Sequence, residues 1–235
     1  MGSYSHLEDV AASDLLRWAI ETYEQRFAIA TGFQKGGMIL LDLAWRTQLP
    51  FRVFTLDTGR LPEETISMLE TVRQRYGIDV EVVTPDPGEA GEMVQSHGLD
   101  LFYDSTEMRQ LCCNVRKVLP LNRKLKEFDA WATGLRRGPG RSRAAVPKVS
   151  ENAGRLKLAP VADWSAEKVN AYIKEFDVPV HPLYAQGYTS IGCAPCTRAV
   201  LEGESERAGR WWWEESTKKE CGIHFAPDCS DGAYI

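Results

Sequence analysis

Two adjacent cysteines near the middle of the chain raise the first question of chemistry. Cys112 and Cys113 lie in the stretch QLCCNVRKVL, and Arg116 and Lys117 follow them closely. A disulfide between neighbours is strained, because the short backbone link works against the dihedral angle that a disulfide prefers. Two side-by-side cysteines can also be small buried hydrophobes. The nearby cations favour a third interpretation, a reduced pair that acts as thiolates.

A second pair of cysteines forms a C-x-x-C motif. Cys193 and Cys196 occur in GCAPCTR, 80 residues beyond Cys113, and this spacing lets two thiolates face one metal centre from a tight turn. A redox dithiol usually opens a helix early in the chain, and this motif comes late. The four thiolates fit either a structural zinc ion or an iron–sulfur cluster, whose iron corners can take neighbouring residues as separate ligands. Because zinc sites are normally built from spaced pairs, the adjacent cysteines favour the cluster, with zinc as the alternative.

Cys221, in KKECGIHF, is a candidate nucleophile. Lys218 and Lys219 precede it and His224 follows it, and nearby cations raise the thiolate fraction of a cysteine. The next residue is a glycine and the cysteine comes late in the sequence, which suggests a mobile segment. An ordinary tail cysteine is the alternative. Cys229 has acidic neighbours, and we interpret it as incidental.

Two groups of arginines could bind an anion. The glycine- and proline-broken loop RRGPGRSR supplies Arg136, Arg137, Arg141 and Arg143, in a chain whose net charge is −5. Arg207 and Arg210 lie three residues apart in ERAGRWWWEE, and a helix there would point both at one anion. Solvated surface charge is the alternative for the loop. Cations beside glycines favour a polyanionic small molecule held by arginine forks.

Alternating strands and helices are predicted to position these residues. The pattern predicts helices over residues 7–25, 38–48, 61–77, 112–127 and 165–176, and strands over 26–31, 51–56, 79–85 and 129–135. Ser165 is the expected N-cap of the last helix. This order is typical of an α/β fold, a single domain with a mainly parallel sheet flanked by helices. The chain from residue 181 onward is loop-rich.

Two loops follow the first two predicted strands. Ligands bind beyond the carboxyl ends of parallel strands, and TGFQKGG and LDTGR occupy that position. We therefore expect substrate contacts from Gly32, Phe33, Asp57, Thr58 and Gly59. The first loop matches neither the P-loop nor the dinucleotide fingerprint, so by itself it predicts a Gly-rich turn.

Composition and charge weigh against several classes of protein. The chain has 235 residues, of which 43% are apolar and 26% charged, as in a soluble globular protein. Its negative net charge argues against nucleic-acid binding, and no apolar run approaches the roughly 18 residues of a membrane span. Residues 1–13 show no secretory signal. We expect a cytoplasmic protein, in which cysteines are more often metal-binding or catalytic than disulfide-bonded.

Several motifs together resemble one family. LDTGRLPEET, CCNVRKVLPLNRKL, WATGLRR, GYTSIGCAPCTR, GRWWWEE and ECGIH occur in this order between residues 27 and 225. They resemble the adenylylsulfate (APS) and phosphoadenylylsulfate (PAPS) reductases of sulfate assimilation. The two cysteine pairs resemble the APS branch, which carries a 4Fe-4S cluster. The family's fold is similar to that of adenine-nucleotide α-hydrolases and ATP pyrophosphatases.

The resemblance implies a role for each candidate residue. Cys112, Cys113, Cys193 and Cys196 become the cluster ligands. Cys221 becomes the nucleophile, Lys117 links cluster and substrate, and Arg207, Arg210 and His224 surround the sulfate. Residues 1–215 would form the reductase domain, and residues 216–235 a mobile segment that carries Cys221. The implied partners are APS and a thioredoxin or glutaredoxin-like reductant; the oligomeric state stays open, a homo-oligomer included.

Three other functions remain as alternatives. The nearest is the same reaction on PAPS, or on both substrates. An adenylating ATP pyrophosphatase would need a fuller Ser-Gly-Gly-x-Asp-Ser loop than TGFQKGG, and a zinc-stabilised adaptor would need no catalysis. The chain also departs from the family where Gly36 and Gly37 replace an acidic pair and where residues 138–140 read Gly-Pro-Gly.

Overall fold

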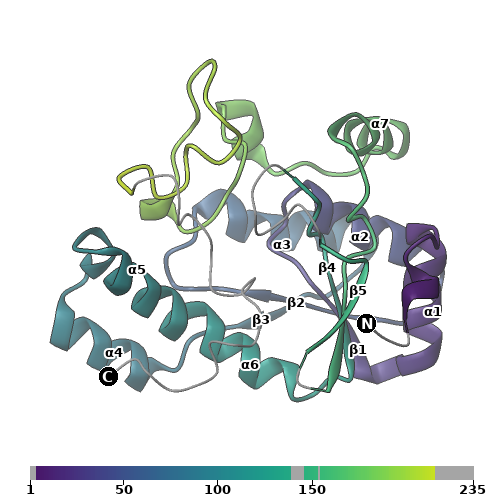
Figure 1. The fold of residues 1–235 in the computed structure, drawn as a ribbon, viewed down its shortest axis with the longest axis horizontal. Coiled ribbons are helices and arrows are strands. Elements are labelled where there is room, and N and C mark those ends of the chain that lie inside the picture. The colour runs from purple at the N-terminus through teal and green to yellow at the C-terminus, as the bar shows by residue number, and fades with distance from the viewer. Residues whose placement is uncertain (1–3, 139–145, 153, 215–235) are drawn as a thin grey trace. The chain divides into compact units, whose positions relative to one another are not determined.

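The chain forms two compact units whose segments alternate along the sequence. The computed structural model describes residues 4–138, 146–152 and 154–214 (Figure 1). The first unit takes in residues 1–55, 63–81 and 125–182, and the second takes in residues 56–62, 82–124 and 183–235. Each unit therefore gathers residues that are far apart in the sequence.

Six strands form one sheet, in the order β3-β2-β1-β4-β6-β5. They are β1 (Phe27–Ala30), β2 (Arg52–Leu56), β3 (Glu81–Val83), β4 (Ala130–Thr133), β5 (Val149–Asn152) and β6 (Arg155–Leu158). β1 runs parallel to β2 and β4, β4 runs parallel to β6, and β5 alone of the paired strands described is antiparallel to its neighbour. The predicted α/β fold with a mainly parallel sheet is confirmed, although neither β5 nor β6 was predicted.

The helices of the first unit are α1 (Ala12–Tyr23), α2 (Lys35–Arg46), α3 (Glu63–Tyr76) and α7 (Ala166–Phe176). Helix α1 was predicted to begin at residue 7, but a short 3₁₀ turn comes first and the helix begins at Ala12. Helix α7 begins as predicted, because the Ser165 hydroxyl accepts a hydrogen bond from the Lys168 N–H at 3.2 Å. Their apolar faces and the strands form one hydrophobic core.

A buried carboxylate ties three of these helices together. Asp42 of α2 is fully buried. It accepts hydrogen bonds from Arg46 Nε at 2.6 Å, Tyr172 of α7 at 2.7 Å and Tyr76 of α3 at 3.3 Å. A buried charge is tolerated only when it is paired in this way.

The second unit contains α4 (Pro87–His97), α5 (Thr106–Cys113), a π turn (Asn114–Val118) and the start of α6 (Leu119–Leu125). Helix α4 was not predicted, although its N-terminus carries a clear signal: Asp86 accepts hydrogen bonds from the N–H groups of Gly88 and Glu89 ahead of a first-turn proline. The helix predicted to begin at residue 112 begins at Thr106. Among the described helices, none combines the length and the apolarity that crossing a membrane requires.

The glycine-rich loop after β1 differs from its prediction. Gly36 and Gly37 lie in the first turn of α2 rather than in a loop. A Cβ atom on Gly36 would lie 2.2 Å from the Gly134 carbonyl oxygen, and one on Gly37 would lie 2.5 Å from Thr31 Oγ1. These glycines therefore serve close approach between a helix and the ends of two strands. Phe33 lies just before them, buried at a φ of +56°.

We expect Gly36→Ala to destabilise the first unit. The added methyl group would force α2 away from the backbone of Gly134, and overpacking of this kind costs about 1–3 kcal/mol. Gly91→Ala is the matched control, because Gly91 is exposed in α4 with nothing within 4 Å of the added Cβ; it should be neutral or stabilise by up to about 1 kcal/mol. Urea unfolding measures both, and equal stabilities would contradict the close approach.

Candidate active site

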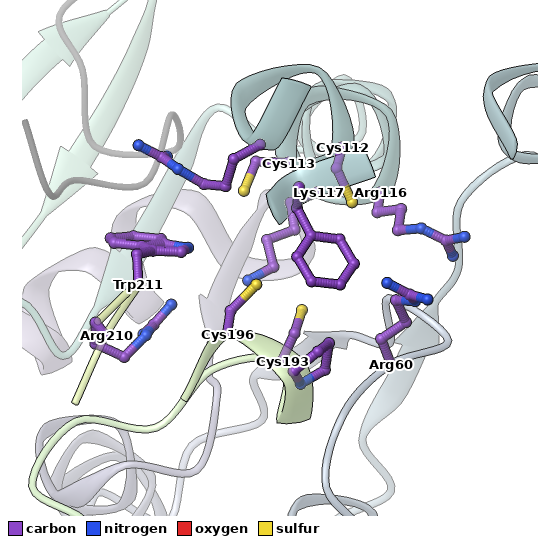
Figure 2. Close-up of a pocket in the computed structure, with 12 residues that line it drawn as sticks. Arg60, Cys112, Cys113, Arg116, Lys117, Cys193, Cys196, Arg210 and Trp211 are labelled. Atoms are coloured by element: carbon purple, nitrogen blue, oxygen red, sulfur yellow. The ribbon is translucent and has the colours of Figure 1, made fainter. Parts of the chain in front are cut away.

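The second unit contains a cavity lined by both cysteine pairs, which we call the cysteine cavity. Figure 2 shows the four sulfur atoms directed into the same space. The full lining is Arg60, Phe102, Arg109, Cys112, Cys113, Arg116, Lys117, Cys193, Pro195, Cys196, Arg210 and Trp211. Five of these residues are cations, and no carboxylate is among the described residues of the lining. The cavity therefore surrounds four thiols with positive charge.

The two cysteine pairs come from different elements. Cys112 and Cys113 end α5, Cys193 directly precedes the 3₁₀ turn Ala194–Cys196, and Cys196 ends that turn. All four are buried and free of disulfide bonds. Burial and the neighbouring Cys193 raise the pKa of Cys196 to about 12, against the opposing charge of Lys117. Burial also raises the pKa of Cys112. A bound metal would favour the thiolate form of such buried thiols.

A π turn directs the two cations that follow Cys113. Pro120 has no N–H group, and in a regular α-helix its ring would clash with the carbonyl of Arg116. The helix widens at this point into the π turn Asn114–Val118, a feature often found at functional sites. Arg116 and Lys117 both line the cysteine cavity (Figure 2). Lys117 thus lines the same cavity as the four cysteines, and its role between cluster and substrate stays a prediction.

The loop that follows β2 also reaches the cysteine cavity. The Thr58 hydroxyl lies 3.2 Å from Cys193 Sγ, and the Thr58 carbonyl accepts a hydrogen bond from Arg116 at 2.9 Å. Asp57 accepts a hydrogen bond from the N–H of Gly59, which adopts a φ of +69°. Thr58 was predicted to contact the substrate; in this structure its side chain contacts a cysteine.

Arg207 and Arg210 do not lie on a helix, so the geometry expected from their spacing is wrong. They lie in a turn in which the Arg210 N–H donates to the Arg207 carbonyl at 3.0 Å. Of the two, only Arg210 lines the cysteine cavity. Its guanidinium lies against Gly192, where an added Cβ would be 2.4 Å from Arg210 Nη2. Both guanidinium groups lie over the ring of Trp211, at 4.5 Å for Arg210 and 5.9 Å for Arg207.

Sequence reasoning missed Arg60 and Arg109. Arg60 lies over the ring of Phe102 at 4.8 Å, and its motif LDTGR was considered only for substrate contacts. Arg109 is fully buried and forms a bidentate ion pair with Glu214. Burial alone would lower the pKa of Arg109, but Glu214 and Cys113 hold it above its usual value. Its position one helical turn before Cys112 and Cys113 was an available signal.

Unpartnered donors surround the cavity. Among the described residues, Arg60 Nη1, Arg116 Nε, Arg210 Nε and Trp211 Nε1 are buried without a hydrogen-bond partner. Such donors fit a bound group that carries acceptor atoms, because a buried unpaired donor is otherwise costly. In the described part of the chain, no three His, Cys, Asp or Glu side chains are placed to hold one metal ion. Four thiols are donors of the kind that an iron–sulfur cluster takes, with each thiolate on a different iron atom.

The remaining predicted residues that the structure describes do not line the cysteine cavity. Gly32, Phe33, Arg136 and Arg137 belong to the first unit. There Arg136 donates to the Trp164 carbonyl at 3.1 Å, while Arg137 donates to the Val146 carbonyl at 2.9 Å and pairs with Glu8. Arg143, Cys221, His224 and the predicted segment 216–235 lie outside the described residues.

Fold and site together define an α/β protein with a cation-lined thiol centre. The family model for the phosphoadenosine phosphosulfate reductase domain matches residues 26–199. This chain belongs to that family. It is 46% identical to the adenosine 5'-phosphosulfate reductase of Allochromatium vinosum, with 93% of this chain and 87% of that protein covered. It is 44% identical to the protein of the same name from Burkholderia cepacia, over 90% and 85%.

Solved structures agree at the level of the fold. The phosphoadenylyl-sulfate reductase of Candida auris, in a phosphate complex, matches with a TM-score of 0.69 and 28% identity, over 83% of this chain and 92% of that one. Yeast FAD synthetase matches with a TM-score of 0.53 and 14% identity, over 80% and 66%. The second likeness shows the fold alone, and it is consistent with the α-hydrolase-like architecture expected from the sequence.

We expect Thr58→Val to weaken the second unit. Valine keeps the shape but leaves Cys193 and the Arg60 N–H without the hydroxyl, which lies 3.2 Å from each. Leaving buried polar groups unsatisfied costs about 1–3 kcal/mol. Thr58→Ser keeps the hydroxyl and should cost less. Denaturant titration measures the free energy of unfolding of both variants. Equal stability of the valine and serine variants would contradict a stabilising role for this hydroxyl.

Proposed function

We propose that this protein reduces APS to sulfite and AMP, as a thiol-dependent enzyme of sulfate assimilation and cysteine biosynthesis. The observation that carries the proposal is the cysteine cavity, in which four buried cysteines without disulfide bonds lie among five cations. The relatives from Allochromatium vinosum and Burkholderia cepacia are named adenosine 5'-phosphosulfate reductases, which supports APS as the substrate.

The four cavity cysteines would hold a 4Fe-4S cluster. Their burial, their freedom from disulfides and the unpartnered donors around them support this assignment. When bound, the cluster would tune the electrostatics of the site, since thiol chemistry already accounts for both electrons of the reduction. Free thiols also fit a reducing compartment, and we infer that the protein works in the cytoplasm.

The first step is nucleophilic. The Cys221 thiolate attacks the sulfur atom of the APS sulfate, the bond from sulfur to the phosphate oxygen breaks, and AMP leaves with that electron pair. Cys221 then carries an S-sulfonate. This step joins two anions, so cations must offset their repulsion. Lys117 and Arg210, which line the cysteine cavity, together with Arg207 and His224, are the proposed source of that charge.

The second step is thiol exchange. A thiolate of a thioredoxin or glutaredoxin-like protein attacks the Cys221 sulfur, and sulfite leaves. The second thiol of that partner then attacks the mixed disulfide, which frees Cys221 and leaves the partner oxidised. The two thiols of the partner supply two electrons to the sulfonate sulfur, so the reaction needs no other electron donor.

The nucleotide contacts remain predictions from the sequence. Gly32, Phe33, Asp57, Gly59, Arg136, Arg137 and Arg143 are the residues concerned. Thr58 remains a candidate as well, although its hydroxyl already contacts Cys193. The departures from the family pattern at Gly36 and Gly37 fall on the start of α2.

PAPS is the second candidate substrate. The family description and the structure from Candida auris both name that compound. The two substrates differ by a 3′-phosphate, so turnover with each compound in parallel separates them. We expect APS to be preferred, because the more similar relatives are APS reductases.

We expect Cys193→Ser to abolish stoichiometric iron. Loss of one thiolate removes one corner of the cluster, so anaerobically purified protein should lose its brown colour and its broad visible absorbance. Cys229→Ser is the matched control and should retain its iron. Full iron content in the Cys193 variant would show that Cys193 is not a ligand. Zinc instead of iron in the wild-type protein would favour the zinc-stabilised adaptor.

We expect APS without reductant to trap one SO₃ group, about 80 Da, on a peptide that contains Cys221. Mass spectrometry of the digested protein locates the adduct. Cys221→Ser should keep its iron and bind APS, but form neither adduct nor sulfite. An adduct on Cys229, or turnover by the serine variant, would overturn the mechanism.

A further inference from the structure

We propose that the buried ion pair between Arg109 and Glu214 anchors segment 211–214 at the cysteine cavity, and that sulfonation of Cys221 depends on this anchoring. This inference rests on the proposed function, since it assumes that Cys221 is the nucleophile. It assigns Arg109 and Glu214 as positioning residues, because neither needs to touch the substrate.

The ion pair has the geometry of a rigid clamp. Arg109 Nε lies 2.7 Å from one carboxylate oxygen of Glu214, and Nη2 lies 3.1 Å from the other. The two side chains are 0% and 5% exposed. A bidentate arginine–carboxylate pair fixes direction as well as distance. An exposed pair would contribute little, whereas breaking a buried one leaves an uncompensated charge.

The clamp joins the segment 211–214 to both cysteine pairs. Arg109 lies on α5, one turn before Cys112 and Cys113. On the other side, the Trp211 N–H donates to the Cys196 carbonyl at 3.2 Å, and the Glu214 N–H donates to the Trp211 carbonyl at 2.9 Å. The four residues that end at Glu214 are therefore held at two points.

Stacking around Trp211 reinforces this arrangement. The guanidinium of Arg109 lies 4.4 Å from the centre of the Trp211 ring, and that of Arg210 lies at 4.5 Å. Trp211 is 0% exposed and lines the cysteine cavity. The Trp211 ring thus contacts both Arg109 of the ion pair and Arg210, which is proposed to bind sulfate.

Chain length limits where Cys221 can act. Cys221 follows Glu214 by seven residues, which span at most about 25 Å when fully extended. If the clamp opened, the last fixed point would be Trp211, ten residues before Cys221. Tether length alone would then lower the effective concentration of Cys221 only about twofold. Loss of orientation is costlier, because a misplacement of about 1 Å can reduce a rate roughly 100-fold.

The test compares Glu214→Gln with the wild-type protein. Both are purified anaerobically and measured for iron per chain, visible spectrum, APS affinity, and the rate of Cys221 sulfonation in a single turnover without reductant. We expect iron, spectrum and affinity within twofold of wild type, and a sulfonation rate at least tenfold lower. Glu214→Asp keeps the charge on a shorter side chain and should recover part of the rate.

The matched control is Glu204→Gln in the same unit. Glu204 forms a bidentate pair with Arg198 at 2.7 Å for both contacts, but that pair is 33% and 27% exposed and does not line the cavity. The control should sulfonate at the wild-type rate. If the sulfonation rate fell equally in Glu204→Gln, the loss would follow from breaking any arginine–glutamate pair in this unit. That result would overturn the proposal.

Two further results would overturn the positioning role. One is a wild-type sulfonation rate in Glu214→Gln, or in Glu214→Asp if the glutamine variant does not fold. The other is a loss of iron or of APS affinity as large as the loss of the sulfonation rate. The ion pair would then stabilise the cavity without positioning segment 211–214 for catalysis. If the wild-type protein itself forms no adduct with APS, the proposed function fails, and that result is separate from either outcome.

Discussion

Concentrated positive charge in a buried cavity is the constraint on which the second unit depends. Five cations line a space that also holds four buried thiols. Glu214 offsets the charge of Arg109, but neutral thiols cannot offset the charge of the other cations. Burial favours the neutral form of a thiol, as the raised pKa of Cys196 shows. Each set is therefore unfavourable alone, and thiolates held by a metal centre would offset the cations. The unpartnered donors of Arg116 and Arg210 are what such a balance requires.

The local structure around this cavity follows from a few sequence features with clear physical effects. Pro120 cannot continue a regular helix, and the widened turn before it sets the direction of Arg116 and Lys117. Gly192 has no side chain, so the Arg210 guanidinium can lie on its backbone. These effects are short-range, and they place cations beside the cysteines without a long helix to carry them.

The sequence predicted the elements whose signal is local and repeated. Periodicity located α2, α3 and α7 and most of the parallel strands, and paired spacing singled out the cysteines before any contact was known. It could not predict the contact of Thr58 with Cys193 or of Arg109 with Glu214, because these contacts join residues more than 100 positions apart. Helix α4 was missed for a different reason. Asp86 and Pro87 are a recognisable N-terminal signal, but the apolar face of the helix is weak and Met93 is its only buried residue.

The charge of the whole chain and that of its cavity have opposite signs, and the difference bears on the chemistry. The chain carries a net charge of −5, which by itself would repel a dianionic substrate. The cations of the cavity come instead from segments that only the fold brings together: Arg60 from a loop, Lys117 from a π turn and Arg210 from a turn near residue 214. In the proposed reaction a thiolate must approach a sulfate, and repulsion between them is strongest where water is excluded. A cavity that is already positive before either anion arrives needs no reorganisation to accept them, which is the property that electrostatic catalysis requires of a site.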